Sequence, residues 1–72
     1  MRKRSFTLAG HKTSLSLEPA FWDALEAMAA RRGQTLTAAI REIDVTREGG
    51  NLSSAVRVAI LRWLQSGADA AG

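Results

Sequence analysis

The chain has 72 residues, no cysteine, one histidine and a formal net charge of +3. A chain of this length forms one small domain, and such domains usually need disulfides, a metal or a partner chain for stability. The lack of cysteine excludes disulfides and thiolate zinc sites, and a single histidine leaves little for acid–base chemistry. We therefore predict a non-enzymatic protein with no catalytic residues, metal or cofactor, stabilised by oligomerisation.

The positive charge is concentrated at the start of the chain. Residues 1–12 carry four basic side chains and no acidic one, whereas residues 13–50 carry six acidic side chains against four basic ones. A basic cluster of this kind favours a polyanionic partner, although it could also serve only as a solubilising tail. We predict a basic N-terminal arm over residues 1–10.

The segment "HKTSLSLEP", residues 11–19, alternates polar and apolar side chains. This period of two predicts a strand over about 11–17, with Leu15 and Leu17 facing a core. The strand could pair with "SFTL" through a turn at Ala9-Gly10, but that dipeptide is a weak hairpin signal. We prefer pairing with the same strand of a second copy.

The residues before this strand do not continue its alternation. Phe6 and Leu8 have the parity of Lys12, so one uninterrupted strand would place them on the wrong face. We expect Gly10 to break the strand as a bulge or kink, which leaves the basic arm free to point elsewhere.

Two helices are predicted next, over about 19–32 and about 36–47. In the first, Pro19 suits the first helical position and Gly33 a C-terminal stop. Its apolar residues recur every three or four positions, at Phe21, Trp22, Leu25, Met28 and Ala29. In the second, Thr35 is a suitable N-cap, and Gly49-Gly50 ends the pattern.

A third helix is predicted over about 53–66, with Ser53 as N-cap and Gly67 just past its end. Its apolar residues spread around most of the circumference, which predicts burial by a second chain. Residues 68–72 contain no core residue and are expected to form a flexible tail. The expected dimer core comprises Leu15, Leu17, Phe21, Trp22, Leu25, Val56, Ile60, Trp63 and Leu64.

The stretches "HKTSLSLEPAFWDALEAMAARRG" and "NLSSAVRVAILRWLQSG" resemble the ribbon-helix-helix family of DNA-binding proteins, which includes the Arc and methionine repressors. The resemblance implies a mainly α fold with one short β-strand, in which two chains intertwine through an intermolecular antiparallel ribbon. The segment "QTLTAAIREIDVTREGGN" adds a helix where the family has a short turn, and a branch of short bacterial proteins has a similar insertion.

The family's DNA contacts map onto this sequence as follows. Base edges in the major groove would be contacted by Lys12, Ser14 and Ser16, and phosphates by Arg2, Lys3, Arg4, Asn51, Ser53 and Ser54. The chemistry agrees, because lysine donates to guanine, hydroxyls donate or accept, and a helix N-terminus attracts anions. Ser14 and Ser16 could instead simply face solvent. Arg57 and Arg62 could be solvated, pair with acids across a dimer or extend the phosphate track.

The predicted function is sequence-specific DNA binding by a small homodimeric bacterial regulator, such as a repressor, in the cytoplasm. Its partner would be double-stranded DNA, on which dimers could assemble further, and no segment approaches the roughly 20 apolar residues that cross a membrane. One alternative is the antitoxin of a toxin–antitoxin pair, although the short segment after Gly67 counts against it. Another is a protein-interaction or assembly module without a DNA role. The inserted helix could dock a protein partner in either case.

Overall fold

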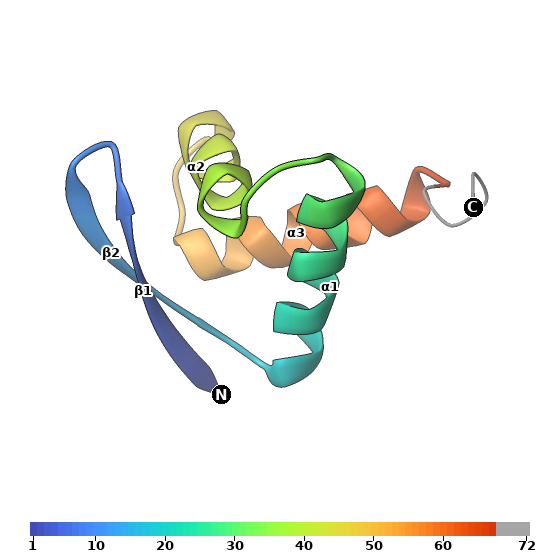
Figure 1. Cartoon of the computed structure of the whole chain (residues 1–72), viewed down its shortest axis with the longest axis horizontal. Helices are drawn as coiled ribbons and strands as arrows, with labels where there is room; N and C mark the ends of the chain where they lie inside the picture. Colours follow the sequence, from blue (N-terminus) through green and yellow to red (C-terminus); the bar gives the residue numbers. More distant parts are fainter. Residues whose placement is uncertain (68–72) are drawn as a thin grey trace.

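Two strands and three helices follow one another in the computed structural model, which describes residues 1–67 (Figure 1). The predicted tail, 68–72, lies outside the described residues. The elements are β1 (Arg2–Leu8), β2 (His11–Leu17), α1 (Pro19–Arg31), α2 (Leu36–Thr46) and α3 (Leu52–Gln65). The predicted fold class, mainly helical with a short β ribbon and an inserted helix, is confirmed.

The ribbon is a hairpin made within one chain. β1 pairs antiparallel with β2, with Leu8 opposite His11 and Arg2 opposite Leu17. The two-residue loop has positive φ at both positions, 52° at Ala9 and 83° at Gly10, as a type I′ turn requires. Glycine adopts this backbone freely, whereas an L-residue with a Cβ does so at a steric cost. The preference for pairing with a second copy was therefore wrong for this edge of β2, because residues 2–8 occupy it.

The tight turn also explains which side chains of β1 face the core. Because Leu8 and His11 are directly opposite, they share one face of the sheet, and Phe6 and Leu8 thereby join the face of Leu15. Leu8 is 3% exposed and Leu15 is fully buried. The expected bulge at Gly10 and the free basic arm were wrong, since the chain reverses there and the arm is a strand.

The helices begin where local signals place them. Pro19 is the first residue of α1, and the Thr35 hydroxyl caps α2 by accepting a hydrogen bond from the Ala38 N–H at 3.0 Å. α3 is capped by Asn51 rather than by Ser53, because the helix already includes Leu52. The Asn51 side-chain oxygen accepts from the Ser54 N–H at 2.7 Å.

One core joins the inner face of the hairpin to all three helices. Most of the predicted dimer core is buried inside the single chain, so its burial requires no partner: Leu15, Leu17, Trp22, Leu25, Val56 and Ile60. Phe21 and Trp63 are half-buried.

Burial of α3 on every side was predicted and is not found in the single chain. Its inward residues are buried, but Val58, Leu61 and Leu64 are 44%, 53% and 45% exposed. α3 therefore presents an uncovered apolar surface. No helix within residues 1–67 is long and apolar enough to span a bilayer.

Candidate nucleic-acid interface

The hairpin has one face that is entirely polar, called here the outer face. Three cross-strand pairs form it, namely Lys3 with Ser16, Ser5 with Ser14 and Thr7 with Lys12. All six side chains are exposed except that of Ser16, which is half-buried. Residues of the opposite parity, including Leu8, Leu15 and Leu17, are buried against the helices. The outer face is therefore turned away from the core.

The structure brings the three predicted base-contact residues, Lys12, Ser14 and Ser16, onto this outer face. Sequence reasoning missed Ser5 and Thr7, and it placed Lys3 in a separate arm. The parity of Phe6 and Leu8 was the available hint, because a two-residue turn at Ala9-Gly10 would put both on the face of Leu15 and Lys3 beside Ser16.

The outer face has dimensions and charge that suit a DNA groove. Two strands lie about 4.8 Å apart, and a two-stranded ribbon fits a major groove about 12 Å wide. The face carries two lysines and no acidic side chain. It therefore offers cationic donors at two positions and hydroxyls between them.

The basic residues at the start of the chain do not form one group. Arg2 and Arg4 have the opposite parity to Lys3. The Arg4 guanidinium lies 4.9 Å from the centroid of the Trp22 ring and 3.7 Å from a Glu26 carboxylate oxygen. The predicted phosphate set of Arg2, Lys3 and Arg4 is thus divided between two faces of the hairpin.

The Trp22 side chain fastens the first strand to α1. Its indole N–H donates to the backbone oxygen of Arg2 at 2.9 Å, and its ring centroid lies 6.0 Å from that of Phe6. Trp22 is 4% exposed, so it belongs to the core and is not a surface platform for stacking bases.

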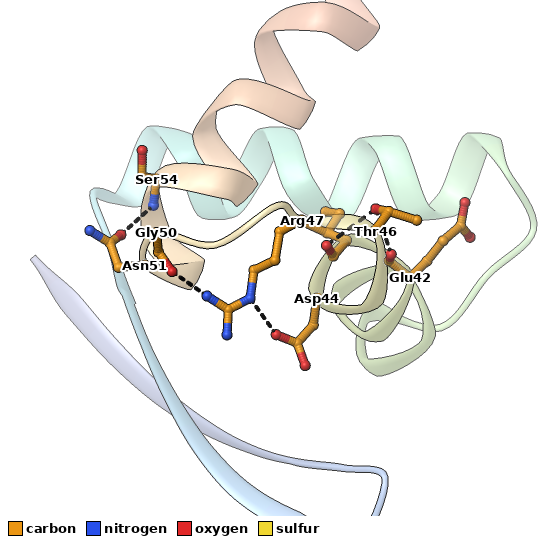
Figure 2. A network of polar contacts seen from close by, with 8 residues as sticks. Glu42, Asp44, Thr46, Arg47, Gly50, Asn51 and Ser54 are labelled. Carbon is orange, nitrogen blue, oxygen red and sulfur yellow. Dashed lines mark hydrogen bonds and ion pairs between the residues drawn. The ribbon is translucent and has the colours of Figure 1, made fainter.

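The α2–α3 connection is held by polar contacts (Figure 2). The Arg47 side chain donates to the Asp44 carboxylate at 2.8 Å and also to the backbone oxygen of Gly50. Next to it, the Asn51 cap bonds the Ser54 N–H. The predicted phosphate residues Asn51, Ser53 and Ser54 thus gather at the first turn of α3, with the Asn51 oxygen already engaged.

The Arg57 side chain joins α3 to the junction between β2 and α1. Two of its nitrogens donate to one Glu18 carboxylate oxygen, at 3.1 and 2.9 Å, and its guanidinium lies 5.6 Å from the Phe21 ring centroid. The alternatives left open for Arg57 did not include this contact, in which it pairs with an acid of its own chain and not across a dimer. The pKa of Glu18 is held below its ordinary value, first by a hydrogen bond from the Glu18 backbone N–H and then by the hydrogen bonds from Arg57.

Among residues 1–67 there is no cluster of three or more potential metal-ligating histidine or acidic side chains. Two polar surfaces of the described chain are open to a ligand, the outer face of the hairpin and the start of α3. Both suit binding to an anion or to hydrogen-bonding base edges.

A family model described as "Ribbon-helix-helix domain" matches residues 1–64. The chain therefore belongs to the ribbon-helix-helix family, and the matched region includes both strands, α1, α2 and all of α3 but its last residue. Domains of this family are typically non-enzymatic DNA-binding regulators or antitoxins, which supports a DNA-binding role here. No curated protein and no solved structure matches the chain significantly.

Proposed function

We propose that this protein is a sequence-specific transcriptional regulator, acting in the bacterial cytoplasm, that inserts the outer face of its hairpin into the major groove. The observation that carries the proposal is the outer face itself, which is polar, exposed and free of acidic residues. The Lys12 ammonium can donate to guanine O6 and N7, and the hydroxyls of Ser14 and Ser16 can donate or accept. Lys12 and Ser14 are exposed, so packing in the core does not account for their placement.

Phosphate contacts would flank the base contacts. Arg2 lies at the open end of the hairpin, and the first turn of α3 carries Asn51, Ser53 and Ser54. A helix N-terminus has unpaired N–H groups and the positive end of the helix dipole, both of which favour a phosphate. Arg4 would contribute through its charge while it remains stacked on Trp22.

A homodimer would cover the apolar surface of α3. Val58, Leu61 and Leu64 recur every three residues along α3 and are all exposed, so they form one apolar strip. Replacing both leucines by aspartate should give a monomer in analytical ultracentrifugation, because burial in a dimer would be lost. Val45→Asp on α2, at a valine that is 68% exposed, is the control and should leave the wild-type assembly unchanged.

The experiment that tests the function is selection of bound duplexes from a random pool. A transcriptional regulator should enrich one motif, and Lys12→Ala should weaken that motif by about 1–3 kcal/mol more than it weakens random DNA. Enrichment of no motif, with binding that depends only on salt, would refute sequence-specific recognition. Absence of DNA retention even at low salt would favour the assembly module instead.

A further inference from the structure

The two strands of the hairpin carry a short internal repeat. The segments "KRSFTL", residues 3–8, and "KTSLSL", residues 12–17, match with an offset of nine residues. Lysine, serine and leucine recur at the first, third and sixth positions, and a hydroxyl residue recurs at the fifth. Each strand therefore offers a lysine and two hydroxyls at alternate positions.

The register converts this repeat into a local two-fold symmetry. Ser5 lies opposite Ser14, and a two-fold axis through that pair, perpendicular to the sheet, superimposes each antiparallel strand on the other. The axis exchanges Lys3 with Lys12 and Thr7 with Ser16. The outer face is therefore nearly symmetric, with one lysine at each of two diagonally opposed corners.

Folding does not require this symmetry of the outer face. The inner face is asymmetric, because Arg4 stacks on Trp22 whereas its symmetry equivalent, Thr13, is half-buried. Substitution of an exposed side chain usually changes the free energy of unfolding by no more than about 0.5 kcal/mol. The repeated lysine and hydroxyl pattern therefore lies on the face where packing imposes the weakest constraint on side-chain identity.

We infer that the hairpin of a single chain is a complete two-stranded reading element, in which Lys3, Ser5 and Thr7 of β1 contact base edges equivalently to Lys12, Ser14 and Ser16 of β2. This inference rests on the proposed function and extends it from one strand to two. Because the symmetry of a binding site mirrors the symmetry of the protein that binds it, the DNA under one hairpin is itself an inverted repeat centred on the Ser5 and Ser14 pair.

The reach of the strands sets the length of that inverted repeat. Lys3 and Thr7 are four residues apart in an antiparallel strand, which rises about 3.4 Å per residue and so spans about 14 Å. Base pairs are stacked about 3.4 Å apart along each DNA strand, so the contacts of one hairpin extend over about four to five base pairs.

The first test compares the two lysines on selected and random duplexes, with Arg41→Ala, an exposed cation of α2, as the matched control. Lys3→Ala and Lys12→Ala should each weaken the selected site about ten-fold or more relative to random DNA, and Arg41→Ala should not. Circular dichroism melts confirm that each variant stays folded.

The second test exchanges the symmetry mates. Thr7→Ser alone makes the outer-face residues of the two strands identical, so the selected motif should become more nearly palindromic. The double variant with Thr7→Ser and Ser16→Thr should exchange the two halves of the motif relative to the flanking DNA that the rest of the protein contacts, because rotation about the axis regenerates the wild-type pattern at these positions.

The outcomes separate this inference from the function on which it rests. If the wild-type protein enriches a motif that depends on Lys12 but Lys3→Ala weakens all duplexes alike, Lys3 is a phosphate contact and the inference is wrong while the proposed function stands. A motif without local inverted symmetry that is indifferent to both Thr7 variants would also overturn it. If the wild-type protein enriches no motif, the proposed function and the inference fail together.

Discussion

Replacing Trp22 by phenylalanine should loosen β1 selectively. The substitution keeps an aromatic ring in the core but removes the indole N–H that donates to the Arg2 backbone oxygen at 2.9 Å. It also weakens the contact with the Arg4 guanidinium, now 4.9 Å from the ring centroid, because phenylalanine attracts a cation less strongly than tryptophan.

The size of the effect follows from these contacts. A hydrogen bond of this kind contributes about 1 kcal/mol, and the weaker cation–π contact costs about 0.5 kcal/mol more. The smaller ring also leaves unfilled space in the core, because the Trp22 side chain that it replaces is only 4% exposed. We expect the free energy of unfolding to fall by about 1.5–2.5 kcal/mol, and the melting temperature to fall on the order of 10 °C for a domain of this size.

Urea denaturation followed by circular dichroism measures the loss, and amide hydrogen exchange locates it. Exchange should accelerate in residues 2–5 more than in α3, because the lost bond holds the start of β1. Trp63→Phe, near the C-terminal end of α3, is the matched control and should leave exchange in β1 unchanged. Unchanged stability, together with unchanged exchange in β1, would show that Trp22 does not fasten this strand and would refute the reasoning.

Three further predictions concern the turn, the two faces and pH. Ala9→Asn should stabilise the protein by about 0.5–1 kcal/mol in thermal melts, because asparagine tolerates the positive φ at this position; a loss of stability would argue against the turn. Leu15→Ala should cost about 2–5 kcal/mol in urea denaturation, whereas Ser14→Ala should stay within about 0.5 kcal/mol; equal effects would contradict the assignment of the two faces. Folding lowers the pKa of Glu18 from its ordinary value of 4.5, so its contribution to stability is present above that pH and is lost as pH falls through the lowered pKa. Glu18→Gln should flatten this part of the acid-denaturation curve, and an unchanged curve would exclude the Glu18 carboxylate as its cause.

The helices and the outward residues of β2 could be predicted because their signals are local. Pro19 and Thr35 occupy the helix starts that their side-chain chemistry favours. Strict alternation placed Lys12 and Leu15 on opposite faces without knowledge of the partner strand. These signals depend on residues within one turn of helix or a few positions of strand.

The partner of β2 could not be predicted, because strand pairing is non-local and the turn sequence is unfavourable. An asparagine or aspartate at position 9 would have marked a type I′ hairpin, whereas Ala9 gives no such signal and adopts positive φ only with the flanking strands to hold it. The cap of α3 was misplaced for a similar reason. Asn51 and Ser53 are both good caps, and the choice depends on Leu52, which is 9% exposed and packs in the core as the first helical residue.

The division of the hairpin into two faces explains why adjacent basic residues have different environments. Lys3 and Arg4 are neighbours in sequence, but the period of two turns one to the outer face and the other toward Trp22. The same alternation lets β2 bury Leu15 and Leu17 while Ser14 and Ser16 remain outside. Because the ion pair between Glu18 and Arg57 joins the end of β2 to α3, the outer face and the first turn of α3 keep a fixed position relative to each other. In the proposed complex, a ribbon inserted in the groove would therefore fix where that helix N-terminus meets the backbone of the DNA.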